Sequence, residues 1–145
     1  MDKVMLANIN PKHQADATVN QAPVSGTKYE WSSDGTTAKA LGTLKNVRII
    51  SIMIQCTWTV QPTPLELHLT IDGQLLKWTK TDPANATDYY AVINDDDAPD
   101  AMAFETGSVS KYRSFLLEGR EVKIEAEITG GTVSNLFMRV KYAKW

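Results

Sequence analysis

The sequence predicts an all-β fold, an antiparallel β-sandwich, on three observations. Apolar and polar residues alternate over long stretches, turn residues separate these stretches, and no stretch has the apolar spacing of an amphipathic helix. Eight or nine such strands in a chain of 145 residues favour a jelly roll, in which two antiparallel sheets pack face to face. We therefore expect a jelly-roll domain over residues 27–145, preceded by an extended N-terminal arm over residues 1–26.

The longest alternating stretch is residues 47–60, VRIISIMIQCTWTV. Every even-numbered residue from Ile50 to Val60 is apolar, and the odd-numbered residues between them are polar except for Met53. This period of two predicts a half-buried strand. Val47 and Ile49 have the opposite parity, which predicts either a β-bulge near Ser51 or burial of both faces at that end.

The other strands follow from shorter alternating stretches and the turns between them. They are expected near residues 27–31, 38–44, 65–71, 76–78, 89–93, 112–117, 121–129 and 136–142. Asp72-Gly73 and Gly130-Gly131 are typical of hairpin turns. The strands near residues 50–60 and 122–142 should supply most of the core. We expect the following residues to be buried together: Ile50, Ile52, Ile54, Trp58, Ile124, Ile128, Met138 and Val140.

Residues 1–26 lack a sustained period and are rich in Ala, Asn, Gln and Pro. Their large aliphatic side chains are too few to order the segment alone, because each ordered residue costs about 1–2 kcal/mol of backbone entropy. We therefore expect the arm to lie on another chain and the protein to form a closed trimer. Phe137 and Trp145 have the outward parity of the last strand and extend this interface. The complete expected interface is Val4, Met5, Leu6, Val19, Phe137 and Trp145.

Composition argues against several classes of protein. The formal net charge is −2, whereas nucleic-acid binding requires clustered Lys and Arg, so we expect no nucleic-acid partner. No apolar run is long enough to cross a membrane, and residues 1–16 lack the apolar core of a secretory signal. The single cysteine, Cys56, excludes an internal disulfide and has the parity of the core, which favours an unreactive thiol.

The polar residues do not form a recognisable reaction centre. His68 is opposite in parity to its leucine neighbours, and no second ligand at metal spacing is apparent on its strand, which favours a surface histidine. The acidic turn 94–100 lacks the pattern of a calcium loop, so solvated carboxylates are preferred to bound Ca²⁺. The outward glutamates of residues 121–127 alternate with Lys123, as on a solvent-exposed charged face. We expect no catalytic, cofactor or metal site, and hence no enzyme.

An arm, a compact jelly roll and no catalytic set together resemble the capsid decoration (cement) proteins of tailed bacteriophages. Residues 46–73 and 112–145 also look similar to trimeric virion knob domains. The resemblance implies a virion structural protein, made in the host cytoplasm and located on the capsid surface. Its function would be to stabilise the shell by trimerising and extending its arm onto neighbours. Its partners would be further copies of itself and the major capsid protein or another virion protein.

A carbohydrate- or receptor-binding β-sandwich, such as a phage tail-fibre tip, is the alternative. Such a site requires outward aromatic side chains beside polar loops. Trp58 has core parity, and Trp78, on the return strand of a predicted hairpin, is a second candidate for the core. Trp145 and Phe137 point outward, and an exposed aromatic pair more often marks a protein interface than a sugar site. The decoration-protein hypothesis is therefore preferred.

Overall fold

The computed structural model describes residues 12–19, 22–31, 44–93, 102–103 and 117–144. These residues form strands and no helix, which confirms the all-β prediction. The strands are β1 (Lys12–Thr18), β2 (Tyr29–Glu30), β3 (Leu44–Val60), β4 (Leu65–Ile71), β5 (Gln74–Lys80), β6 (Tyr89–Ile93), β7 (Met102–Ala103), β8 (Leu117–Ile128) and β9 (Thr132–Lys144). The predicted strands at residues 38–44 and 112–117 lie mostly outside the described residues.

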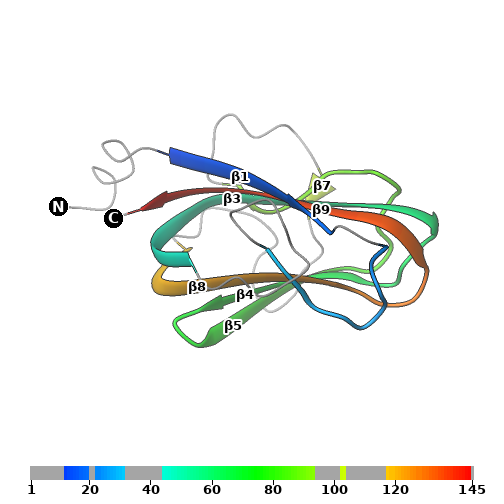
Figure 1. Cartoon of the computed structure of the whole chain (residues 1–145), viewed down its shortest axis with the longest axis horizontal. Helices are drawn as coiled ribbons and strands as arrows, with labels where there is room; N and C mark the ends of the chain where they lie inside the picture. The colour runs from blue at the N-terminus through cyan, green and yellow to red at the C-terminus, as the bar shows by residue number, and fades with distance from the viewer. Residues whose placement is uncertain (1–11, 20–21, 32–43, 94–101, 104–116, 145) are drawn as a thin grey trace.

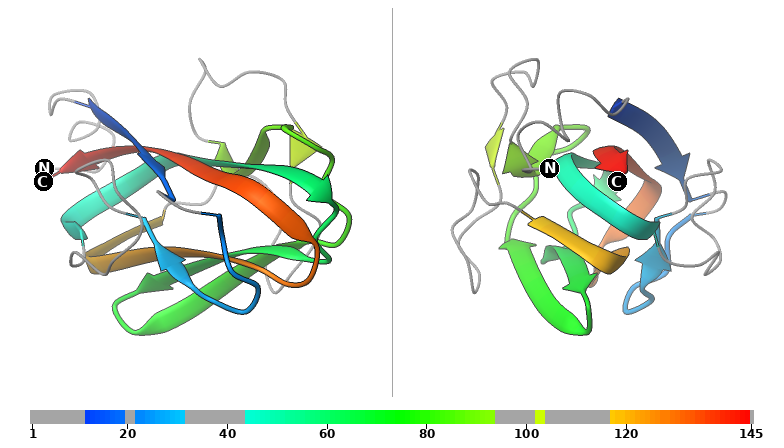
Figure 2. Two further views of the ribbon diagram at one scale, coloured as in Figure 1. Left: turned by 45° about the vertical axis from the view of Figure 1, so that its right-hand side comes forward. Right: turned by 90° about the vertical axis from the view of Figure 1, so that its left-hand side faces the viewer.

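The strands form two layers. Pairing gives one row in the order β1-β9-β3-β6 and another in the order β2-β8-β4-β5, and Figure 1 shows β1, β3 and β9 in the layer opposite β8, β4 and β5. The views in Figure 2 show the same two layers. Consecutive strands change layer except in the β4–β5 hairpin and the parallel β6–β7 pair. This order is that of a jelly roll.

The long strand β3 joins the two layers at one corner. Its first residues pair with β8, and from Val47 onward it pairs with β9. The register with β9 shifts between Ile49 and Ser51, as the bulge alternative predicts, and residues 49–54 are buried on both faces, as the other alternative predicts. Val47 and Ile49 on one side of the bulge, and Ile52 and Ile54 on the other, are all completely buried in the core.

The interior is filled by large apolar side chains from both layers. Every expected core residue on β8 and β9 is in the core cluster, and Trp58 is half-buried at its margin. Ile50 is the exception: it is buried but lies outside that cluster, because the bulge places Ile50 and Ser51 between two inward positions. The largest fully buried side chains are Trp78, Tyr89, Ile49, Ile52, Ile54, Leu65, Leu67, Leu69, Ile124, Ile128 and Leu136.

Residues 12–19, which were expected to be part of an arm on another chain, lie on their own subunit. All seven residues of β1 pair antiparallel with β9 of the same chain. The Val19 N–H donates to the Leu136 carbonyl at 3.0 Å, and the Val19 side chain is only 4% exposed within the core. Val19 thus packs in the core of its own subunit, because Ala17 and Val19 alternate with polar residues and extend the core along β9. Val4, Met5 and Leu6 lie outside the described residues.

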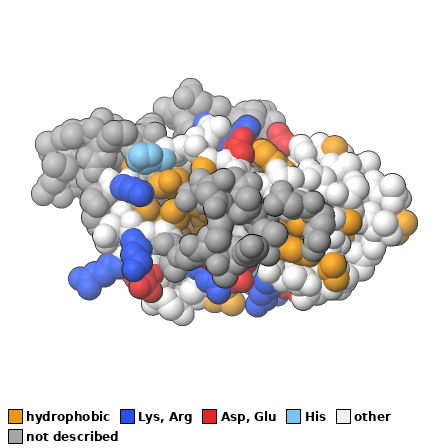
Figure 3. Space-filling model, in the orientation of Figure 1, with side chains coloured by type: hydrophobic (Ala, Val, Ile, Leu, Met, Phe, Trp, Pro, Cys, Tyr) orange, Lys and Arg blue, Asp and Glu red, His pale blue; other side chains and the backbone are white. Residues whose placement is uncertain are grey.

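The outer surface of the described part carries charges of both signs. On the face shown in Figure 3, basic and acidic side chains lie interspersed. One bidentate pair fastens β1 to β9: the Arg139 guanidinium donates to the two carboxylate oxygens of Asp16 at 2.8 and 3.0 Å. Among the described residues, no helix is long and apolar enough to cross a membrane.

Candidate functional site

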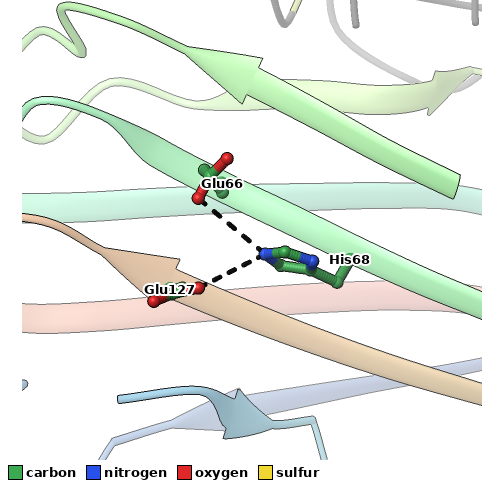
Figure 4. Close-up of side chains that lie close together, drawn as sticks. All are labelled: Glu66, His68 and Glu127. Atoms are coloured by element: carbon green, nitrogen blue, oxygen red, sulfur yellow. Dashed lines mark ion pairs between the residues drawn. The ribbon is translucent and has the colours of Figure 1, made fainter. Parts of the chain in front are cut away.

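Three potential ligand side chains converge on the outer face of the β2-β8-β4-β5 layer. Leu65, Leu67 and Leu69 of β4 point into the core, so the alternation of the strand places Glu66 and His68 on the opposite face. Glu66 is the direct cross-strand partner of Glu127 on β8. Figure 4 shows the two carboxylates and the imidazole pointing toward one another.

The distances define a compact cluster, named here the Glu66–His68–Glu127 cluster. His68 Nε2 lies 3.5 Å from Glu127 Oε1 and 3.9 Å from Glu66 Oε1. One ligand atom from each residue lies within 4.8 Å of the other two. This is the one group of three or more His, Cys, Asp or Glu ligand atoms found in the described part of the chain.

The histidine of this cluster is buried, which corrects the prediction of a surface histidine. His68 is 5% exposed, and neither ring nitrogen has a hydrogen-bond partner in the described structure. It is buried because β4 is a central strand with a neighbour on each side, so His68 on its outer face is flanked by Lys77 of β5 and Glu125 of β8. A buried polar atom without a partner costs about 1–3 kcal/mol, so His68 is the feature of this face that most needs an explanation.

The charge state of His68 follows from its burial. Burial lowers its pKa below the usual value because it disfavours the imidazolium, and the Glu66 carboxylate only partly opposes this effect. This lowered pKa favours the uncharged ring at neutral pH, and the two contacts drawn in Figure 4 are ion pairs only when the ring is protonated. A neutral imidazole has a free lone pair, which is the form that binds metal ions.

Glu66 is oriented by its other neighbours. Its Oε2 accepts a charge-assisted bond from Lys77 Nζ at 2.6 Å and a bond from the Thr79 hydroxyl at 3.5 Å. These contacts direct Oε1 toward His68. The Glu66 and Glu127 side chains are 13% and 18% exposed, so both carboxylates lie close to the surface without being fully solvated.

Comparisons with protein-family models, curated proteins and solved structures find no match to this chain. The site is therefore interpreted from its own geometry. Sequence spacing alone missed it. Glu66 precedes His68 by two residues on the same face of one strand, a signal present in the sequence, but Glu127 is 59 positions further along (127 − 68) and meets it only through the β4–β8 register.

The remaining charged residues near this face behave partly as expected. Glu121 is exposed, and Lys123 Nζ lies 3.8 Å from Glu125 Oε2, as predicted for a face of mixed charge. The prediction that this face is solvent-exposed is wrong for Glu125 and Glu127, whose side chains are only 16% and 18% exposed. Glu30 on β2 differs, since it is 7% exposed and burial raises the pKa of its carboxyl. The acidic turn 94–100 lies outside the described residues.

The sole cysteine, the second histidine and the expected interface residue Phe137 differ in their exposure. Cys56 is buried, and desolvation raises the pKa of its thiol to about 11, which disfavours the reactive thiolate. His13 is exposed and stacks on Tyr142 with ring centroids 5.2 Å apart. Phe137 is half-buried beneath the Arg139 guanidinium, 5.6 Å from the ring centroid. Trp145 lies outside the described residues.

The described tryptophans offer no aromatic platform. Trp31 and Trp78 are buried in the core. Trp58 is half-buried, and its indole N–H donates to the Pro83 carbonyl at 3.1 Å. A sugar-binding site built on stacked, exposed tryptophans is therefore not formed by the described part of the chain.

Proposed function

We propose that the protein is a non-enzymatic virion structural protein that decorates a capsid shell and stabilises it as a trimer. The observation that supports this proposal is the strand order, because jelly rolls with this order form many viral capsid domains. The support is a likeness of fold, since one fold can carry many functions. The major capsid protein or another virion protein is the proposed partner.

Two further observations favour a mechanical function over catalysis. The interior between the layers is filled by fully buried side chains such as Trp78, Tyr89 and Met138. The sole thiol, Cys56, is buried with its thiolate disfavoured. These features suit a rigid building block, because close-packed interiors resist deformation.

The proposed assembly contacts differ from those expected of a long arm. Val19 is removed from the interface because it lies in the core of its own subunit. Residues 1–11, with Val4, Met5 and Leu6, remain the proposed arm. Edge strands offer additional contacts, because β5 ends its row and presents Leu75, which is 53% exposed.

The experiment compares a shortened chain with the full chain. Removing residues 1–11 leaves β1 intact, so the truncated protein should fold, yet it should bind preformed capsid shells more weakly in cosedimentation. A full-length variant with Val4, Met5 and Leu6 changed to serine should lose binding to the same extent. Val24→Ser is the matched control, because Val24 is 55% exposed and outside the proposed arm.

Light scattering and glycan binding complete the test. The full chain should have the mass of a trimer in solution, and it should not bind a panel of glycans. A protein that stays monomeric, does not bind capsid shells and binds a specific glycan would overturn the proposal and support the receptor-binding alternative. Equal shell binding by the truncated and full chains would remove residues 1–11 from the mechanism.

A further inference from the structure

We propose that Glu66, His68 and Glu127 bind one divalent transition-metal ion per chain, with Zn²⁺ as the best-fitting ion. The ligand atoms are Glu66 Oε1, His68 Nε2 and Glu127 Oε1. The inference does not depend on the proposed function in capsid assembly. It rests on the buried, unpartnered imidazole that points at two carboxylates.

The separations suit an ion better than hydrogen bonds. Zinc binds imidazole nitrogen and carboxylate oxygen at about 2.0–2.2 Å with tetrahedral angles, so two of its ligand atoms lie roughly 3.4 Å apart. The separations from His68 Nε2 are 3.5 Å to Glu127 Oε1 and 3.9 Å to Glu66 Oε1. Neither contact forms a hydrogen bond, because His68 Nε2 has no such partner. The third separation, between the two carboxylates, is at most 4.8 Å.

The strand register holds the ligands in place and supplies a reason for a cation. Glu66 and Glu127 face each other directly across two central strands, an arrangement in which like charges repel. A divalent cation bound between the two carboxylates would attract both of them and outweigh their repulsion. Because β4 and β8 are each paired on both sides, their backbones hold the three side chains in a fixed relation.

The surroundings of Glu66 complete the site. Lys77 and Thr79 engage its Oε2, which holds Oε1 toward the position of the ion. Outer contacts of this kind orient metal ligands and tune their affinity. The ligand set also selects the ion: one imidazole and two carboxylates suit Zn²⁺, whereas Ca²⁺ requires six to eight oxygens. A water molecule would fill the fourth position.

The test begins with chelator-treated, full-length protein. Calorimetric titration with Zn²⁺ should give one ion per chain. Titration with Co²⁺ should produce the intense visible absorption of a tetrahedral complex. At a Zn²⁺ concentration about a hundredfold above its Kd, the unfolding temperature should rise by about 5–10 °C.

Three variants separate this site from incidental binding. Glu127→Gln preserves side-chain shape and should weaken Zn²⁺ binding by more than about 100-fold, beyond the effect usual for outer-shell residues. His68→Gln should do the same, and circular dichroism verifies that each variant is folded. His13→Gln is the matched control: it removes the exposed histidine of the other layer and should leave affinity and stoichiometry unchanged.

The outcomes are decisive. Absence of Zn²⁺ binding by the full chain overturns the proposal, as does wild-type affinity in a folded Glu127→Gln protein. Loss of binding in His13→Gln alone would assign the ion to that histidine and equally refute this site. A Co²⁺ spectrum typical of an octahedral aqua ion would show that the imidazole and carboxylates do not form the tetrahedral set.

Discussion

Replacing Val19 by alanine tests whether residues 12–19 belong to the core of their own subunit. The substitution removes two methyl groups from a side chain that is 4% exposed. At about 0.8 kcal/mol for each buried group, with an added cost for the cavity, the free energy of unfolding should fall by about 2 kcal/mol. Val24→Ala is the matched control, because Val24 is 55% exposed and should change that free energy by less than about 0.5 kcal/mol.

The assay is urea unfolding followed by tryptophan fluorescence, since Trp31 and Trp78 are buried in the folded state. It should be repeated over about a hundredfold range of protein concentration, because contacts between chains make the unfolding midpoint concentration-dependent. A core role predicts the same loss for Val19→Ala at every concentration. Equal stability of the Val19→Ala and Val24→Ala proteins, or a loss confined to high concentration, would refute the reasoning and return Val19 to an interface.

Three further predictions concern substitution or reaction at single residues. Gly131→Ala should lower the free energy of unfolding by about 1–3 kcal/mol more than Gly130→Ala in urea titrations; both have φ near +70° (71° and 69°), but only a Cβ at Gly131 would lie 2.6 Å from the Val60 carbonyl oxygen. Cys56, with its pKa raised to about 11, should react with a thiol reagent only when the chain unfolds, and rapid labelling of native protein would contradict this. Burial lowers the pKa of His68, so His68 binds a proton near pH 6.5 in the unfolded chain but not in the folded chain. In the presence of chelator, the free energy of unfolding should therefore fall as the pH drops below about 6.5. His68→Gln should make the free energy of unfolding less dependent on pH in that range.

Alternation was sufficient to predict the long strands. Ile52 and Ile54 are buried as their parity requires. The opposite parity of Val47 and Ile49 predicted a bulge or burial of both faces, and the structure shows both. These features are local, because a strand with one buried face records its orientation in every second residue. The sandwich could therefore be read from short windows of sequence.

The first strand was missed because its inward side chains are small. Ala15 and Ala17 give a weak apolar signal, although Ala17 and Val19 both lie in the core. Their burial depends on β9, which begins more than a hundred residues later in the chain. A partner so distant in sequence leaves no trace in the local pattern.

The candidate metal site shows the same limit more sharply. Parity correctly placed His68 on the face opposite the core, but parity distinguishes faces and says nothing about how deeply an outer side chain is covered. The partnership with Glu127 follows only from the register of β4 on β8. Sequence could nominate Glu66 and His68 as a pair on one strand, whereas the third ligand required the fold.

In the Glu66–His68–Glu127 cluster, the strand register brings together side chains that destabilise the sheet. Two opposed carboxylates destabilise a sheet, and a buried imidazole without hydrogen bonds adds about 1–3 kcal/mol to that cost. Glutamine at position 66 or 127 would remove the repulsion and could donate a bond to the ring. Conflicts of this kind are expected at functional sites, because elsewhere each local choice tends to agree with the fold. An ion at this position would remove both conflicts at once, by neutralising the carboxylates and giving Nε2 a partner.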